Sequence, residues 1–371
     1  MTSFAEAPSR ARRLIQRDDT IISTVRTYLR AVWPVRENVS GVVVSTGFAV
    51  LTPGKGIEPR YLGWLIQSDL VVEEVVARSV GVSYPAISAN DIGNIRVPLP
   101  SWSTQRAIAD YLDVETARID RLIEKKQRIT ELLMYKWRCE LVDRLAPHLQ
   151  THSGDSQLPT DWRMSRLRRL VDRVVGGSWG SEQGVDEVDA VCVRAADFDF
   201  PGLEATEGVT RSFGAAELSR RATRPGDFIL EKSGGGDEAP VGRVVQWNGV
   251  SIAMPTNFAA RLRVAPGVDS LFALYCFRAA YEVGYNWRSI KQTTGIQNLD
   301  SNSYLAESWP IPPLEEQRRI ATSLKLSLAN VLKIQSRLRE QVGLLRERRQ
   351  TVITAAVTAQ LGIPEVTHGD D

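Results

Sequence analysis

The feature of this sequence that most limits its fold is a short proline-rich segment that occurs twice. Residues 98–109 read PLPSWSTQRAIA, and residues 310–321 read PIPPLEEQRRIA. The identical pairs are Pro98/Pro310, Pro100/Pro312, Gln105/Gln317, Arg106/Arg318, Ile108/Ile320, Ala109/Ala321 and, just beyond, Leu112/Leu324. Further pairs of similar segments lie upstream: 45–54 with 255–267, and 17–23 with 224–231. A duplication of this extent indicates a tandem repeat of one structural unit.

The segment after each proline-rich hinge has the pattern of a long helix. Apolar residues recur at steps of three and four, with Arg, Lys and Glu between them, as in RLREQVGLLRERRQ. In chain order they are Ile108, Leu112, Ile119, Leu122, Ile129 and Leu133, then Ile320, Leu324, Leu328, Val331, Leu338, Val342 and Leu345. A narrow apolar seam on a charged helix is typical of a coiled coil. We therefore predict two long helices that pair antiparallel as a coiled coil, related by a pseudo-twofold axis.

The hinges also predict where these helices begin and end. Their prolines impose extended backbone and end the preceding strand. Ser103 is expected to cap the first helix, and Glu315 and Glu316 lie at the positive end of the second. Pro147 is expected to end the first helix, and THSGDSQLP (151–159) reads as a polar linker.

The segments before the hinges predict small mixed α/β domains. They contain short β-type runs such as VSGVVVSTGFAVL and DAVCVRA, separated by Gly, Pro and Asp. The predicted class is α+β, with two small mixed α/β domains in tandem, each followed by a long helix. The predicted boundaries are 1–101 for the first domain, 102–146 for the first helix, 147–157 for a linker, 158–313 for the second domain, 314–360 for the second helix and 361–371 for a flexible tail.

Composition excludes several classes of protein. No apolar run reaches the length of a membrane span, and MTSFAEAPSRARR at the N-terminus has no signal-peptide core. We therefore expect no membrane partner and a cytoplasmic location. The cysteines at 139, 192 and 276 are too far apart to predict a disulfide framework or a zinc site. A net charge of +2 does not by itself indicate nucleic-acid binding, although arginines cluster at 10–17 and 163–173.

The sequence contains no motif that predicts catalysis. Its histidines fall in a linker and a tail, outside any metal-binding motif, and PGKG at 53–56 lacks the spacing of a phosphate-binding loop. A methyltransferase needs a Pro-Pro-aromatic motif, but the Pro-Pro at 312–313 is followed by Leu314. Glu231 and Lys232 are adjacent, so on a strand they would face opposite ways and could not share a nuclease metal. We predict no catalytic residue, no metal site and no cofactor in this chain.

Three motifs, in this order, resemble the specificity (S) subunit of type I restriction-modification systems. They are PLPSWSTQRAIADYLDVETARIDRLIEKK (98–126), LPTDWRMSRLRRLV (158–171) and PIPPLEEQRRIATSL (310–324). The second is similar to the usual entry into a target-recognition domain, and TARID at 116–120 is especially typical of the family. The resemblance covers 158–358 and the first copy from about residue 12.

This resemblance implies a subunit that does no chemistry. Each small domain would be a target-recognition domain that reads one half of a bipartite site on double-stranded DNA, for host defence. The helices would set the spacing and dock two modification subunits, which carry S-adenosylmethionine and methylate adenine. Restriction-motor subunits, which use ATP and Mg, would complete a type I site-specific deoxyribonuclease. The alternative, from another class, is a coiled-coil adaptor that reads no DNA, left from a degenerate system.

The first domain departs from the family pattern in its length. About a hundred residues precede its hinge, and nothing there corresponds to the stretch from LPTDW to RAADF at 158–198. We therefore expect an N-terminally shortened first target-recognition domain. The true start would lie upstream of Met1, the gene would be truncated, or a companion polypeptide would supply the missing part.

Candidate DNA contacts are polar and basic residues on loops that could enter a groove. They are Arg78, Ser79, Ser83 and Tyr84 in the first domain, and Lys232, Ser233, Arg243, Arg288, Lys291, Gln292, Thr293 and Thr294 in the second. Arg243 and Arg288 are candidates for phosphate contacts, and the glycines at 234–236 would allow close backbone approach. Each could instead be an exposed loop residue that touches no ligand.

Two further groups receive structural predictions. The hinge residues Gln105, Arg106, Gln317 and Arg318 recur in both copies, so each pair is expected to do the same job twice. Packing of the hinge and direct contact with partner subunits both remain open for them. Trp162, Trp179 and Trp309 are assigned to the core.

Overall fold

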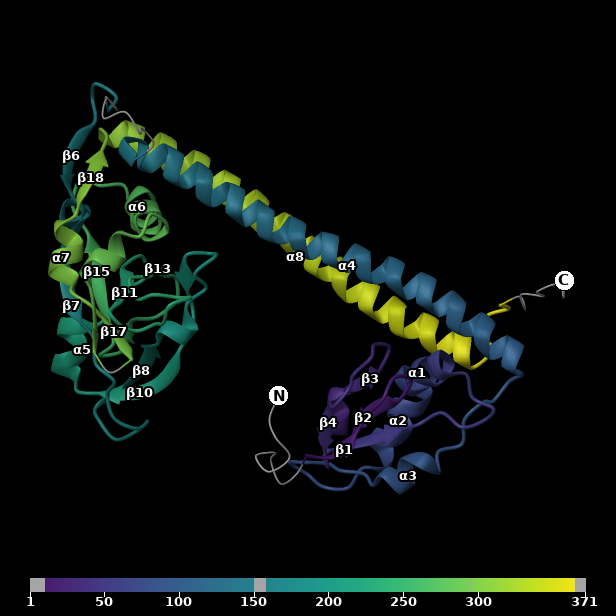
Figure 1. Ribbon diagram of the computed structural model, residues 1–371. Helices are drawn as coiled ribbons and strands as arrows, with labels where there is room; N and C mark the ends of the chain where they lie inside the picture. The colour runs from purple at the N-terminus through teal and green to yellow at the C-terminus, as the bar shows by residue number, and fades with distance from the viewer. Residues whose placement is uncertain (1–10, 150–157, 294, 364–371) are drawn as a thin grey trace. The chain divides into compact units, whose positions relative to one another are not determined.

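The computed structural model describes residues 11–149, 158–293 and 295–363 (Figure 1). The chain forms two compact units: the first comprises Met1–Ile129 and Arg337–Asp371, and the second comprises Thr130–Ser336. The long helices α4 (Trp102–Leu145) and α8 (Leu314–Val357) each contribute residues to both units. The predicted α+β class, with a long helix after each small domain, is confirmed. In the described ranges, every helix is too short or too polar to cross a bilayer.

The first unit is built on a small antiparallel sheet with three short helices. The sheet has the order β3-β2-β5, from β3 (Val32–Pro34), β2 (Thr20–Ser23) and β5 (Phe48–Leu51). A second pair joins β1 (Ala11–Leu14) to β4 (Val43–Ser45). The helical elements are η1 (Thr27–Leu29), α1 (Pro59–Gln67), α2 (Asp69–Arg78) and α3 (Ala89–Gly93).

The core of the first unit includes residues of both long helices. Tyr61 and Trp64 of α1 pack in one cluster with Leu112 of α4 and Ile353 of α8. The apolar face of α1 is therefore buried by side chains from opposite ends of the sequence. Burial of this kind is the main favourable contribution to folding.

The second unit is larger, and its described residues form four sheets. The main sheet has the order β7-β15-β11-β13-β9, from β7 (Val171–Gly176), β15 (Ala259–Val264), β11 (Phe228–Glu231), β13 (Val244–Trp247) and β9 (Glu204–Ala205). A second sheet has the order β10-β8-β14, from β10 (Val209–Phe213), β8 (Val188–Val193) and β14 (Ala253–Pro255). A third has the order β12-β17-β16, from β12 (Ser233–Gly234), β17 (Ile296–Leu299) and β16 (Ile290–Thr293). The fourth pairs β18 (Ser308–Ile311) with β6 (Arg163–Arg166). The helical elements are η2 (Pro147–Leu149), η3 (Leu167–Leu170), η4 (Ala195–Asp197), α5 (Ala215–Arg221), α6 (Ser270–Glu282), η5 (Tyr285–Ser289) and α7 (Ser301–Ala306).

Helix α6, which Figure 1 shows between the strands of the second unit and the long helices, supplies much of the core of that unit. Its residues Phe272 and Phe277 are fully buried and belong to a cluster that also holds Trp137 of α4 and Leu324 of α8. Trp309 is fully buried in the same cluster and Trp162 packs against it, as predicted. The long helices thus serve this core as they serve that of the first unit.

The two units share a backbone turn that is held by a buried aspartate. Asp19 Oδ2 accepts a hydrogen bond from the Gln16 amide at 3.0 Å, and Asp227 Oδ2 accepts one from the Arg224 amide at 3.0 Å. Each aspartate is buried at the start of an equivalent strand. The repeat that the two hinge sequences predict therefore includes this turn, upstream of each hinge.

The hinge glutamines bond equivalent backbone groups in both units, and Gln105 has one further carbonyl partner. Gln105 Oε1 accepts a hydrogen bond from the Glu58 amide at 2.8 Å, and its Nε2 donates to the carbonyls of Gly56 and Pro100 at 2.9 Å. Gln317 Oε1 accepts from the Asp269 amide at 3.0 Å, and its Nε2 donates to the Pro312 carbonyl at 3.0 Å. Glu58 and Asp269 are the N-caps of α1 and α6. Each buried glutamine therefore ties the start of a long helix to the start of a domain helix, whereas Arg106 and Arg318 are exposed.

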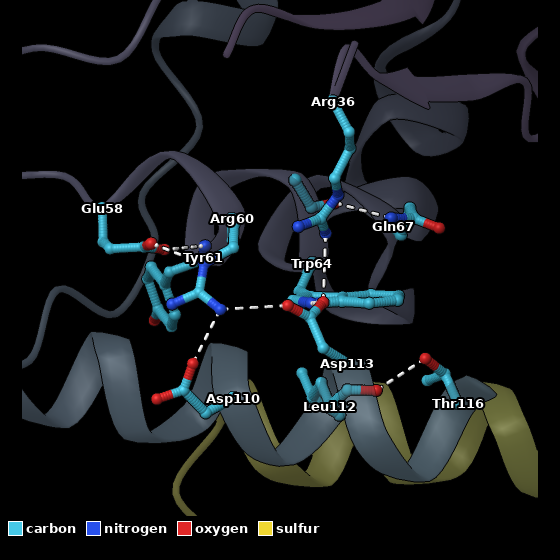
Figure 2. A network of polar contacts seen from close by, with 11 residues as sticks. Arg36, Glu58, Arg60, Tyr61, Trp64, Gln67, Asp110, Leu112, Asp113 and Thr116 are labelled. Atoms are coloured by element: carbon cyan, nitrogen blue, oxygen red, sulfur yellow. Dashed lines mark hydrogen bonds and ion pairs between the residues drawn. The ribbon is translucent and has the colours of Figure 1, made fainter. Parts of the chain in front are cut away.

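In the first unit, a charged network reinforces this joint (Figure 2). The Arg60 guanidinium bonds Glu58 at 2.9 Å, Asp110 at 2.7 Å and Asp113 at 3.1 Å. Trp64 Nε1 donates to Asp113 Oδ1 at 2.9 Å. Figure 2 shows Arg60 of α1 directed at the carboxylates of α4. The orientation of α1 on the long helix is thus fixed by directed polar contacts as well as by apolar packing.

The start of α4 corrects one prediction. The helix begins at Trp102, so its cap is Ser101, whose Oγ accepts a hydrogen bond from the Thr104 amide at 3.1 Å. Ser103 was expected in this role but lies inside the first turn. At its other end α4 stops at Leu145, shortly before Pro147 as predicted, and Glu315 and Glu316 lie in the first turn of α8.

The long helices run antiparallel within each unit. In the first unit, Lys126 Nζ donates to Gln341 Oε1 at 2.7 Å, and Arg349 Nε donates to Asp120 Oδ1 at 3.0 Å. In the second unit, Gln335 Nε2 donates to the Thr130 carbonyl at 2.8 Å. Coiled-coil packing along their full length stays a prediction.

The predicted apolar seam is correct for α8 but partly wrong for α4. Leu122 and Ile129 are 42% and 46% exposed. The partly buried positions are instead Ile123, Lys126 and Thr130. Apolarity was therefore a poor guide here, because polar residues that bond the partner helix occupy the seam.

We expect Gln105→Ala to lower the free energy of unfolding by about 1–3 kcal/mol, because it leaves the Glu58 amide and two carbonyls without their partner. Arg106→Ala, at the neighbouring exposed position, is the matched control and should change stability by no more than about 0.5 kcal/mol. Urea denaturation followed by circular dichroism measures both. Equal stability of the two variants would show that the glutamine does not hold the joint.

Candidate nucleic-acid interface

Several loops of the second unit meet at one end of its main sheet. The backbone amides of Lys232 and Ser233 donate to the Phe258 carbonyl at 2.7 and 3.0 Å. The Ser178 amide donates to the Pro255 carbonyl at 2.9 Å, and Ser233 Oγ donates to Asn298 Oδ1 at 2.6 Å. Segments 177–180, 232–236, 256–258 and 296–298 therefore form one surface, which we call the loop edge.

The loop edge combines an unpaired cation with exposed aromatic rings. Among the described residues, the Lys232 ammonium has no ion-pair partner. Phe258 is 57% exposed and Trp179 is 41% exposed, with the Arg211 guanidinium 4.8 Å from the Trp179 ring centroid. The assignment of Trp179 to the core is therefore wrong. Exposed aromatic and basic side chains at one edge are groups that contact bases and phosphates.

Glycines fix the shape of the loop that carries Lys232. Gly234 and Gly235 have φ angles of +117° and +60°, a region that favours glycine. A Cβ on Gly235 would lie 2.8 Å from the Val241 amide nitrogen. Beneath the loop, the buried Gln297 side chain accepts a hydrogen bond from that amide at 3.2 Å. The glycines therefore have a role in the fold of the loop, and the close approach of their backbone to DNA stays a prediction.

The β16–β17 hairpin carries the second predicted group. Lys291 is exposed and its Nζ lies 3.1 Å from Asp300 Oδ2. Gln292 is exposed, and Thr293 is the last residue of β16. Thr294 lies outside the described residues. Since β17 pairs with β12, this hairpin and Ser233 belong to the same small sheet.

The structure gives Arg243 a different role from the predicted phosphate contact. Its Nε and Nη2 both donate to the carboxylate of Glu231 at 2.8 Å, and Glu231 is buried. This hydrogen-bonded pair raises the pKa of Arg243 above its ordinary value. The guanidinium is thus committed to a buried carboxylate. Arg288 is 57% exposed and paired with Glu307 at 3.0 Å, so it remains accessible.

The first unit presents a comparable loop. Val80 and Ala86 exchange backbone hydrogen bonds, which leaves residues 81–85 as a tip. Ser83 is exposed, and Tyr84 is 61% exposed with the Arg26 guanidinium 4.6 Å from its ring centroid. Of the other two predicted contacts, Arg78 pairs with Glu74 and Ser79 bonds the hydroxyl of Thr27. The structure therefore places Ser83 and Tyr84 at a loop tip and engages Arg78 and Ser79 within the fold.

A cavity of about 480 Å³ in the second unit was not predicted. Five arginines line it, and we call it the arginine cavity: Arg173, Arg220, Arg224, Arg261 and Arg263. The Arg263 backbone pairs with Arg173 of β7, and Arg261 lies two residues earlier on β15. The available signal was the basic run RRATRPGD at 220–227 together with RLRV at 261–264. These segments were missed because they are distant in sequence and each is unremarkable alone.

Within the ranges that the structure describes, no three or more His, Cys, Asp or Glu side chains are grouped to hold a metal ion.

The sequence of this chain is similar to those of known specificity subunits. No family model matches the chain. In sequence, it is 22% identical over 315 residues to the type I restriction enzyme StySPI specificity subunit of Salmonella potsdam, across 84% of this chain and 67% of the relative. It is also 22% identical over 178 residues to the MjaIX specificity subunit of Methanocaldococcus jannaschii, across 42% of this chain and 40% of the relative.

Two solved structures share the fold. One is a chain from a study of complex assembly and conformational transition of the type I R-M system, with a TM-score of 0.70 and 26% identity. The other is the HsdS subunit from Thermoanaerobacter tengcongensis, with a TM-score of 0.50 and 25% identity. Each match covers 96% of this chain and 85% of the solved chain.

The sequence matches and the solved structures define a single class, the DNA-specificity subunits of restriction enzymes. In sequence and in fold, this chain is similar to the specificity subunits of type I restriction-modification systems. The resemblance to a specificity subunit, read from the motifs of the sequence, is thereby confirmed.

We expect Arg243→Ala to destabilise the protein by about 3–5 kcal/mol, because it leaves the Glu231 carboxylate buried without its partner. Lys291→Ala removes a cation of similar size from an exposed pair and should change stability by less than about 1 kcal/mol. Chemical denaturation of both variants measures the difference. A mild effect of Arg243→Ala would return this residue to the group of candidate DNA contacts.

Proposed function

We propose that this chain reads a bipartite site on double-stranded DNA, with one half-site read by each unit. The observation that carries the proposal is the repeated joint, in which Gln105 and Gln317 fix a domain helix to a long helix in the same way. Two readers attached by one kind of rigid joint to paired helices would bind DNA at a fixed spacing. When two units that each bind DNA weakly are linked in this way, the affinity of the whole chain for a site with both halves exceeds that of either unit, without any new contact.

The loop edge is the proposed reading surface of the second unit. Lys232 and Ser233 can donate hydrogen bonds to base edges, and Lys291, Gln292 and Arg288 are exposed residues of the neighbouring hairpin region. In the first unit the loop tip with Ser83 and Tyr84 is the proposed counterpart. Phosphate contacts would position both units, and base contacts would select the sequence.

The long helices are the proposed docking surface for two modification subunits. In the first unit, exposed apolar side chains on these helices are Val114, Leu122, Ile129 and Leu344; in the second, they are Leu132, Tyr135, Leu326 and Ile334. Exposed apolar groups on otherwise charged helices are suited to protein contacts. Arg106 and Arg318 lie exposed at the joints and would extend this surface.

The chemistry of the complex would reside in its other subunits. S-adenosylmethionine would be carried by the modification subunits, and ATP and Mg by the restriction-motor subunits. Such a complex acts on chromosomal and invading DNA, so we propose a cytoplasmic location. A coiled-coil adaptor without DNA reading is the competing function, and it leaves the Lys232 loop without a ligand.

Deletion of the gene should abolish one bipartite methyl-adenine motif from the host genome, as measured by base-resolution methylome sequencing. Complementation with the full chain should restore the motif. Complementation with Lys232→Ala should weaken or relax one half of it and spare the other, because only the second unit is altered. Arg168→Ala, a basic residue exposed elsewhere in that unit, is the control. An unchanged methylome on deletion would leave the adaptor function.

Leu326→Asp should weaken assembly with the modification subunits roughly tenfold or more, because it places a charge in an apolar contact. Thr322→Asp, an exposed position one turn away, is the matched control. Co-purification and analytical ultracentrifugation measure assembly, and thermal denaturation verifies the fold. Full assembly of Leu326→Asp would remove this part of α8 from the docking surface.

A further inference from the structure

Acidic groups do not balance the charge of the arginine cavity. Arg263 is paired with Asp227, with Nε and Nη2 both 3.1 Å from its carboxylate. Asp172 is also close enough to raise the pKa of Arg263. In the part of the chain that the structure describes, the side chains of Arg173, Arg220 and Arg224 take part in no ion pair. The cavity therefore carries excess positive charge.

Arg261 contributes a buried and incompletely hydrogen-bonded cation to the cavity. Its residue is 4% exposed, and its Nη1 donates to the Ala222 carbonyl at 2.6 Å. Its Nε is buried without a hydrogen-bond partner. Burial lowers the pKa of Arg261, and the charges of Arg263, Arg173 and Arg224 lower it further. A buried cation among like charges is costly unless an anion completes the site.

We propose that the arginine cavity binds a phosphate group of the DNA backbone, an inference that rests on the proposed function. Guanidinium groups bind phosphate with paired hydrogen bonds, and several of them can share one phosphate. The cavity is thus a positioning site that is independent of DNA sequence.

The position of the cavity favours DNA over a free anion. Arg173 lies on β7 three residues before Gly176, a distance of about 10 Å along a strand. A Cβ on Gly176 would lie 3.7 Å from Lys232 Nζ, so Lys232 reaches the end of the same strand. Strand β7 is at the edge of its sheet. Because 173 and 176 are an odd number of residues apart, the cavity and Lys232 lie on opposite faces of this edge strand. A duplex that approached the edge itself could meet Lys232 from one face in a groove about 12 Å wide and place a flanking phosphate in the cavity on the other.

The test compares full-length variants in which one exposed arginine of the cavity is replaced, Arg173→Gln and Arg224→Gln. Arg168→Gln removes the same charge from an exposed position outside the cavity and is the matched control. Affinity for a duplex that contains the methylated motif and for a random duplex is measured by fluorescence anisotropy over a salt series. We expect each cavity variant to reduce the slope of log K against log salt by about 0.9. It should also weaken both duplexes by a similar factor, on the order of tenfold.

Each outcome decides the inference. Slopes equal to that of the wild type, in variants that unfold at the wild-type temperature, would overturn it while leaving the proposed function intact. Binding of inorganic phosphate that Arg224→Gln abolishes, together with unchanged DNA slopes, would identify a small-anion site and also overturn it. If the wild-type chain, alone and with modification subunits, bound no duplex, the proposed function and this inference would fail together.

Discussion

The structure depends on one buried amide in each unit. The hinge glutamine joins three stretches of backbone: the extended proline segment before it, the long helix that carries it, and the N-cap of the domain helix. A carbonyl in each proline segment, that of Pro100 or Pro312, needs a hydrogen-bond donor, and the glutamine Nε2 supplies it. Its Oε1 at the same time accepts the amide of the N-cap residue. A neutral side chain with both a donor and an acceptor is required here, which explains why glutamine occurs at this position in both copies.

The contact between the long helices also depends on directed hydrogen bonds. Lys126 with Gln341, and Gln335 with the Thr130 carbonyl, replace apolar contacts with directed bonds. Apolar side chains tolerate a slip of one turn, whereas a hydrogen bond to a particular group does not. The seam therefore gives up some hydrophobic stabilisation and gains a defined register. In the proposed function the long helices set a spacing, so a defined register matters more there than maximal stability.

The repeat, the two helices and the hinge were predictable because they depend on local spacing, which a sequence displays directly. The predicted seam was wrong at Leu122 and Ile129, because the position of the partner helix, and not hydropathy, decides which side of α4 is buried. The ion pair of Arg243 could not be predicted for a related reason: its partner Glu231 is adjacent only once β11 and β13 pair. The arginine cavity needed the register of β7 with β15, which no local pattern reveals. Sequence thus predicted the frame and several loops of the candidate site, but not which of their charges are already satisfied.

The first unit has a consequence for how the protein is made. Ile353, Ala356 and Val357 of α8 are fully buried in its core, together with residues from the opposite end of the chain. The second unit, in contrast, is one continuous stretch. At the usual rates of synthesis, the first unit leaves the ribosome roughly 10–50 s before the residues that complete its core. The part that is translated first therefore finishes folding last, and a nascent or prematurely ended chain exposes that apolar surface to chaperones and proteases.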